Sequence, residues 1–156
     1  MTAGGDAPAG GSFADEAFAV TADAYGRAHG GWEGSVQAAI ARLFGFLADR
    51  ADQAKACLVA DHEGTHAALT QRDRVIARFT ALLQPGFEAA DPPPPPVVAE
   101  AIGGGIYELL RNHALERRLE ELPAAVPNAV VVVLSPFTGP DRAIKLANSE
   151  NVQASR

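Results

Sequence analysis

The segment 62–66 (HEGTH) has the residue types and the spacing of a zinc-binding motif. On a continuous helix, His62 and His66 lie four residues apart on one face and can bind Zn²⁺ together. Glu63 would then act as the general base on a metal-bound water, and Glu88 is a candidate third ligand. This chemistry would be that of a zinc-dependent hydrolase, which we keep as the alternative function.

Gly64 lies inside the motif and argues against that alternative, because the two imidazoles share a face only if the helix is unbroken. A pattern with three fixed residues also arises by chance, and acidic residues beside histidines are common at polar junctions between helices. We therefore predict no metal site, no cofactor and no enzymatic activity for this chain.

A second unusual feature is the run of three glycines, Gly103, Gly104 and Gly105, within a segment that otherwise reads as one helix, Val97–Leu122. A glycine in a helix interior costs roughly 1 kcal/mol relative to alanine. Three in a row indicate a place where the backbone approaches another helix, a second subunit or a ligand. A phosphate-binding loop is excluded, because no strand precedes the glycines and no Lys-Ser/Thr pair follows them.

Length and charge narrow the class of protein further. A chain of 156 residues, 47% of them hydrophobic, is long enough for one domain with its own core. The formal net charge of −6 opposes DNA binding by this chain, since phosphate contacts need clustered Lys and Arg. A single cysteine, Cys57, suits a reducing cytosol. We expect neither a signal peptide nor an apolar run of the ~20 residues that a membrane span needs.

Apolar periodicity predicts helices along the first half of the chain. Ser12 is the expected N-cap of a first helix that ends at Gly30-Gly31, and residues 1–11 are expected to be disordered. Further helices are predicted over about 32–50, 52–61 and 67–83, the last one stopped by Gln84-Pro85-Gly86.

The second half begins with the five prolines Pro92–Pro96, which form an extended connector before the glycine-containing helix. Propensity alone favours a strand for the run 129–134 (AVVVVL). We predict a helix there, over about 126–137, because the chain offers no partner strand. Residues 141–156 form a polar tail. The prediction is therefore an all-α helical bundle.

Three strings in this order resemble one family of proteins: TQRDRVIARFTALLQPGFEAA (70–90), PPVVAEAIGGGIYELL (95–110) and ELPAAVPNAVVVVLSPFTGP (121–140). The stretch from Gly31 to Gly139 is similar to the C-terminal regulatory domain of TetR transcriptional regulators, most closely the actinobacterial type. The resemblance covers about two-thirds of the chain. It rests on the ordered combination, since no single string is a catalytic signature.

The resemblance implies a cytoplasmic, bacterial homodimer that binds a small apolar effector, with residues 12–140 as the effector-binding and dimerisation domain. The last two long helices would pair with those of a second subunit in a four-helix bundle, while the helices 32–50 and 67–83 would wall the effector cavity. The pocket residues implied are Phe44, Leu47, Phe79, Leu83, Ile102, Ile106 and Tyr107. The dimer residues implied are Gly103, Gly104, Leu110, Val130, Val133 and Phe137.

The sequence departs from this family at its start. Full-length relatives carry a helix-turn-helix headpiece that reads operator DNA, and nothing in the thirty residues before Gly31 matches it. We therefore expect a truncated regulator or one that has no headpiece. A further alternative is a chain that pairs with full-length relatives through the same bundle and inactivates them.

Overall fold

The computed structural model describes residues 12–60 and 64–153, and every regular element within them is helical. The prediction of an all-α fold is therefore confirmed. The elements are α1 (Phe13–Arg27), α2 (Gly31–Asp49), α3 (Ala51–Ala60), α4 (His66–Thr80), the 3-10 turn η2 (Ala81–Leu83), α5 (Gln84–Ala89), α6 (Val97–Leu115), the 3-10 turn η3 (Leu119–Glu121), α7 (Leu122–Thr138) and α8 (Pro140–Gln153).

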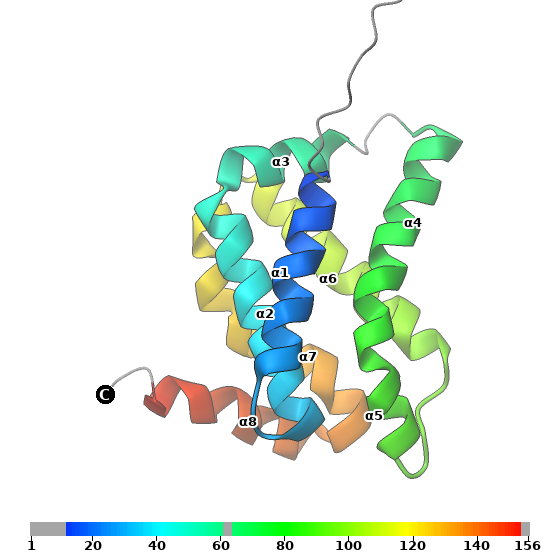
Figure 1. The fold of residues 1–156 in the computed structure, drawn as a ribbon, viewed down its shortest axis with the longest axis vertical. Helices are drawn as coiled ribbons and strands as arrows, with labels where there is room; N and C mark the ends of the chain where they lie inside the picture. Colours follow the sequence, from blue (N-terminus) through cyan, green and yellow to red (C-terminus); the bar gives the residue numbers. More distant parts are fainter. Residues whose placement is uncertain (1–11, 61–63, 154–156) are drawn as a thin grey trace, which may run out of the picture.

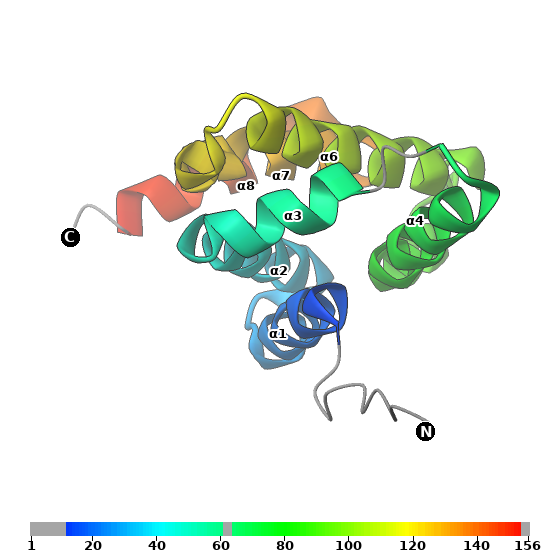
Figure 2. The ribbon, with the colours of Figure 1, turned by 90° about the horizontal axis from the view of Figure 1, so that it is seen from above.

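The helices form layers around α2. Helix α1 packs along one side of α2, and α7 packs along the other (Figure 1). Seen from above, α6, α7 and α8 make up a back layer, and α3 crosses between α2 and α6 (Figure 2). Helix α4 rests mainly on α6 and touches α1 only lightly. This arrangement leaves space between α1, α2, α4 and α6 that side chains must fill or line.

The start of α1 is fixed by the predicted N-cap. The Ser12 hydroxyl accepts a hydrogen bond from the Asp15 amide at 3.2 Å, and the Asp15 carboxylate accepts one from the Ser12 amide at 3.1 Å. This reciprocal capping box satisfies two amide donors that the first turn would otherwise leave open.

Replacing Ser12 by alanine is therefore expected to lower the free energy of unfolding by about 1 kcal/mol. Urea denaturation measures this difference. The same exchange at the exposed Ser149, whose hydroxyl donates only to the Leu146 carbonyl, should stay within about 0.5 kcal/mol of the parent. Equal losses in the two variants would show that the cap contributes nothing specific.

Two predicted helix ends differ from the structure. Helix α4 ends at Thr80, before the predicted Leu83, and Gln84-Pro85-Gly86 forms the start of the next helix, α5, because Pro85 takes a first-turn position where its missing amide costs nothing. The glycine-containing helix ends at Leu115 rather than at Leu122. Arg117 there adopts φ +58°, and the Arg118 amide donates to the His113 carbonyl at 2.8 Å, which closes the helix end. This turn brings Leu119 and Leu122 into the core.

The glycines of α6 do not share one role. A methyl group built on Gly103 would lie 2.5 Å from Ile76 Cγ2 and 2.7 Å from Thr80 Cγ2 of α4. At Gly104 and Gly105 nothing lies within 4 Å of that position. The predicted close approach therefore exists at Gly103 alone, and its partner is helix α4 of the same chain.

Helix α7 confirms the helical assignment of the valine run. Val130 and Val133 are buried, whereas Val132 is 54% exposed, as a helix with one inward face requires. The segment assigned to a polar tail contains α8, which buries Ala143 and Ala147 against α7. The Gln37 amide of α2 donates to the Leu146 carbonyl at 2.7 Å and ties α8 to the bundle.

One described segment, Leu119–Thr138, is long and apolar enough to cross a membrane by length and composition, which the sequence analysis did not anticipate. In the structure its inward side chains fill the core of the bundle. Those that are buried are Leu119, Leu122, Ala129, Val130, Val133 and Leu134. A core helix passes the same test of length and composition.

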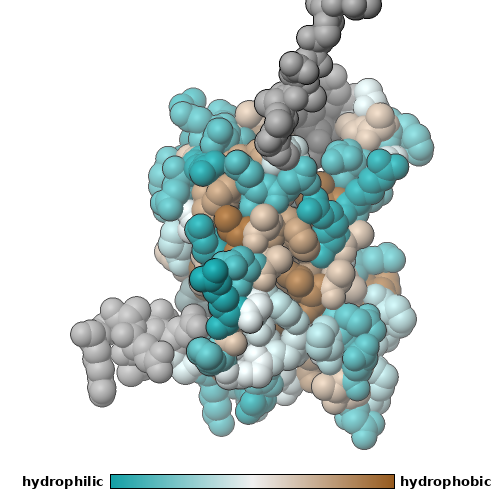
Figure 3. Space-filling view, viewed as in Figure 1, coloured by the Kyte–Doolittle hydropathy of each residue, from teal (hydrophilic) through white to brown (hydrophobic). Residues whose placement is uncertain are grey.

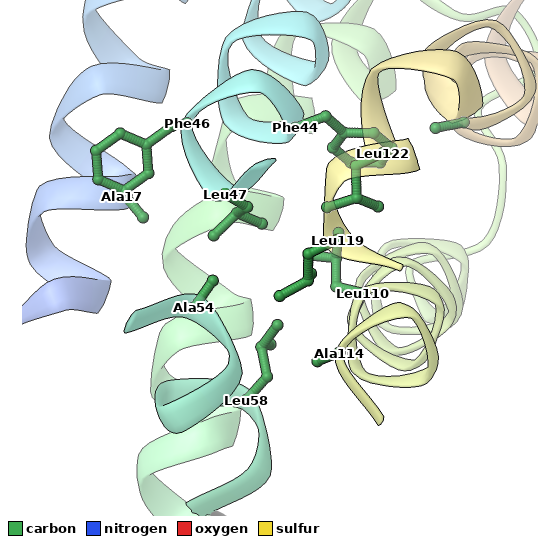
Figure 4. Close-up of a cluster of buried hydrophobic side chains, with 11 residues drawn as sticks. Ala17, Phe44, Phe46, Leu47, Ala54, Leu58, Leu110, Ala114, Leu119 and Leu122 are labelled. Atoms are coloured by element: carbon green, nitrogen blue, oxygen red, sulfur yellow. The ribbon is translucent and has the colours of Figure 1, made fainter. Parts of the chain in front are cut away.

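The core has two connected parts. The first lies where α2, α3, α6 and η3 meet, and Figure 4 shows Phe44 beside Leu122 there, with Leu110, Ala114 and Leu58 nearby. The second joins α2, α6, α7 and α8. Both parts are apolar, so burial of these side chains is the main stabilising contribution to the bundle.

Candidate ligand-binding cavity

An apolar cavity of about 420 Å³ lies among α1, α2, α4 and α6. Its volume falls in the range of roughly 300–1,000 Å³ typical of small-molecule sites. Two residues each of η2 and α3 and one of α7 complete its walls. It reaches the surface near the exposed residues Ser12 and Gln71, on the face where α1 and α4 lie side by side. Figure 3 shows apolar side chains surfacing on this face within a hydrophilic border.

Six of the seven residues implied as pocket residues line this cavity: Leu47, Phe79, Leu83, Ile102, Ile106 and Tyr107. They come from α2, α4, η2 and α6, so the fold brings together residues distant in sequence. Phe44 does not line the cavity. Its side chain is 0% exposed and lies in the first core cluster, to which Leu47 also belongs.

Most polar groups of the cavity wall already have hydrogen-bond partners. The Thr21 hydroxyl donates to the Ala17 carbonyl at 2.7 Å, and the Thr80 hydroxyl donates to the Ala77 carbonyl at 3.2 Å. The Tyr25 hydroxyl donates to the Leu82 carbonyl at 3.1 Å. Since these groups are satisfied within the chain, the interior presents an apolar surface to a ligand.

At one end of the cavity, the carbonyl oxygen of Leu82 joins three helical elements. It accepts hydrogen bonds from the Tyr25 hydroxyl and from the Trp32 indole nitrogen, the latter at 3.0 Å. Burial raises the pKa of Tyr25, so the phenol stays protonated and remains a donor. These two bonds fix η2 against α1 and α2 and give the cavity a rigid floor.

Among the described residues that line the cavity, Arg72 is the only charged one. Its guanidinium lies over the ring of Tyr107, with Cζ 4.6 Å from the ring centroid. Its Nε is shielded from solvent and has no hydrogen-bond partner among the described residues. A buried donor left in this state costs roughly 1–3 kcal/mol, so the position of Arg72 is one that stability alone does not favour.

The other charges near the opening are already paired. Arg78 of α4 donates to Asp15 of α1 at 2.6 Å, and Arg50 donates to Glu16 at 2.8 Å. The hydrogen bond from Arg78 holds the pKa of the Asp15 carboxyl below its usual range, with further help from Ser12. Arg78 also lies over the ring of Phe18, 4.4 Å from its centroid. The Arg78–Asp15 pair joins α1 to α4, and the Arg50–Glu16 pair joins α1 to the end of α2.

Sequence reasoning missed two contributions to the cavity. Helix α1 was not assigned to its walls, yet Phe13, Ala17, Thr21 and Tyr25 line it at helical spacing. Arg72 was not among the residues that the sequence assigned to the pocket. Its spacing, three residues after Leu69 and four before Ile76, puts it on the same helix face as these two residues and could have identified it.

The residues implied for a dimer interface differ in how exposed they are in the single chain. Leu110, Val130 and Val133 are buried within one chain, so a second copy would not contact them in this conformation. The Phe137 ring packs edge-on against Trp32 and Phe87, with centroids 5.2 and 4.9 Å apart. Gly103 faces α4, and of the implied set only Gly104 has open space beside it.

The metal-binding motif lies partly outside the described residues, which do not include His62 and Glu63. Gly64 adopts φ +58° and Thr65 is the N-cap of α4, so no continuous helix runs through the motif to His66. Glu88 lies on α5 and accepts a hydrogen bond from Gln84. Within the described ranges, no group of three or more His, Cys, Asp or Glu residues is arranged to hold a metal.

Titrating Zn²⁺ into the purified chain is therefore expected to release no binding heat and to leave the melting temperature unchanged. Isothermal titration calorimetry and a thermal melt measure these quantities, with Mg²⁺ as the control ion. A stoichiometric heat that disappears in a His66→Ala variant would overturn this expectation and would support the hydrolase alternative.

Comparison of the chain with protein-family models, with curated proteins and with solved structures gave no match.

Proposed function

We propose that this chain is an effector-binding and dimerisation domain of the TetR type, which binds a small apolar ligand. The observation that carries the proposal is the apolar cavity walled by α1, α2, α4 and α6. Six residues assigned to a pocket by the family resemblance meet at that one cavity, which supports the assignment. The net charge of −6 opposes phosphate contacts, so direct DNA binding by this chain is not part of the proposal.

The proposed mechanism is a shift between two arrangements of α1 and α4. These helices meet through few contacts, chiefly the Arg78–Asp15 ion pair and the edge-on packing of Phe18 against Phe79 at 5.3 Å. An exposed ion pair contributes little stability, so a modest difference in ligand affinity is enough to change the spacing of the two helices. A ligand between them would favour one spacing over the other.

Binding can be tested with a neutral apolar dye, N-phenyl-1-naphthylamine, followed by its fluorescence. We expect saturable binding of one dye per chain. Val75→Trp places a large ring in the cavity and should abolish this binding. Ala77→Trp, at an exposed position of the same helix, is the matched control and should bind like the parent. Binding that persists equally in both variants would count against the cavity as the ligand site.

Dimerisation is the second part of the proposal. We assign the interface to the outward faces of α6 and α7, which include Gly104, Gly105 and Val132. Glycines there leave the helix backbone open to close approach by a second helix. The back layer of Figure 2 presents these two helices together.

Size-exclusion chromatography with light scattering, with and without EDTA, measures the oligomeric state. We expect a dimer that is indifferent to chelator and that dissociates in Val132→Asp. The variant Leu69→Asp adds the same charge at a similarly exposed position of α4 and should remain a dimer. A parent chain that is monomeric at micromolar concentration would contradict the dimer but not the ligand cavity.

A further inference from the structure

The proposed function does not yet explain why the side chain of Arg72 lacks a carboxylate partner among the described residues. Most other arginines of the described chain pair with a carboxylate: Arg27, Arg50, Arg78, Arg111, Arg118 and Arg142. Arg72 has no such partner among the described residues and is held instead by the ring of Tyr107. Its charge is thus directed at a cavity rather than at a protein group.

The groups around Arg72 indicate which kind of ligand could bind its guanidinium. The guanidinium Cζ lies over the ring of Tyr107, 4.6 Å from its centroid. A guanidinium can bind a carboxylate through two parallel hydrogen bonds from its N–H groups. Gln71 is exposed beside the opening and offers further donors. Asp15 and Glu16 of α1 are already paired with Arg78 and Arg50. Neither of these carboxylates compensates the positive charge of Arg72.

The rest of the cavity indicates the chemistry of the other end of the ligand. Beyond Arg72 the lining is aliphatic or aromatic, and the hydroxyls of Thr21, Tyr25 and Thr80 are already bonded to backbone carbonyls. One cation at the opening and an apolar interior match a molecule with one charge and one apolar chain. A dianionic phosphate would leave a negative charge unpaired, because the described residues that line the cavity include no second cation.

We infer that the cavity takes a single-chain amphipathic carboxylate, with the Arg72 guanidinium binding the carboxylate and the apolar interior holding the chain. This inference rests on the proposed ligand-binding function and specifies its ligand class. Tyr107 packs against the guanidinium in this arrangement.

The test compares dodecanoate with 1-dodecanol, which has the same chain but no charge, by isothermal titration calorimetry below their aggregation concentrations. For the parent chain we expect dodecanoate to bind about ten- to a hundredfold more tightly, since hydrogen bonds to a charged group add that much affinity. Decanoate, shorter by two methylenes, should bind about tenfold more weakly than dodecanoate.

The variant Arg72→Gln should lose this preference and bind the two ligands about equally, with 1-dodecanol unaffected. Arg74→Gln removes the same charge from an exposed position of α4 outside the cavity and should retain the preference. Arg72→Lys keeps the charge without the planar donor pair. Its preference for dodecanoate should be smaller than that of the parent chain and larger than that of Arg72→Gln.

The outcomes separate the inference from the function it rests on. If 1-dodecanol binds the parent chain as tightly as dodecanoate, or if both glutamine variants weaken dodecanoate equally, the role of Arg72 is overturned while the apolar cavity stands. If neither ligand nor the neutral dye binds, the proposed function fails as well. Retention of the parent melting temperature in Arg72→Gln shows that any lost binding is not lost folding.

Discussion

Replacing Phe44 by alanine is expected to lower the free energy of unfolding by about 3–5 kcal/mol, the largest effect expected of any single substitution in this chain. The ring is 0% exposed and packs beside Leu122 where α2 meets η3 and α7 (Figure 4). Its removal leaves a void that rigid neighbours on several helices cannot fill. Equilibrium urea denaturation measures the loss, provided that the slope of the transition is unchanged.

Two control variants distinguish a loss of core packing from an effect on the surface or on the cavity. Leu115→Ala, at a position that is 45% exposed, should change stability by no more than about 0.5 kcal/mol. Phe79→Ala removes a half-buried ring that lines the cavity, so its main effect should fall on dye binding. If Phe44→Ala instead weakened dye binding at nearly full stability, Phe44 would belong to the ligand site and not to the core.

The second large effect is expected at Gly103. Alanine at Gly103 and at Gly105 gains the same helix propensity, about 1 kcal/mol, so the difference between the two variants isolates the packing against α4. At Gly103 the added methyl would meet the branched side chain of Ile76 and the methyl of Thr80, whereas Gly105 has open space. We expect Gly103→Ala to be less stable than Gly105→Ala by about 1–3 kcal/mol.

Thermal and urea unfolding of the two variants measure this difference. Combining Gly103→Ala with Ile76→Leu, which removes the branch nearest to the new methyl, should recover part of the loss. Two equally stabilised variants would mean that α4 does not approach α6 as closely as described. A wider spacing of α4 and α6 would also mean a larger cavity, because Gly103 and Ile76 both line it.

The sequence by itself determined the helical class and most element positions. Periodic apolar residues, the Ser12 capping box and the glycines at positions 30 and 31 are local signals, and the helices they predicted are present. The valine run was assigned correctly because a lone strand has no partner to complete its hydrogen bonds. Residues of several helices were likewise assigned to one pocket, and six of them line one cavity.

Only the tertiary structure decided where those helices end and what their faces touch. The end of α6 depends on a left-handed Arg117, a residue type with no local preference for that conformation, and it is favoured because the turn buries Leu119 and Leu122. Periodicity identifies the apolar face of a helix but not which neighbour covers each part of it. That is why Leu47 lines the cavity while Phe44, three residues earlier, does not, and why Gly103 faces α4 while Gly105 faces outward.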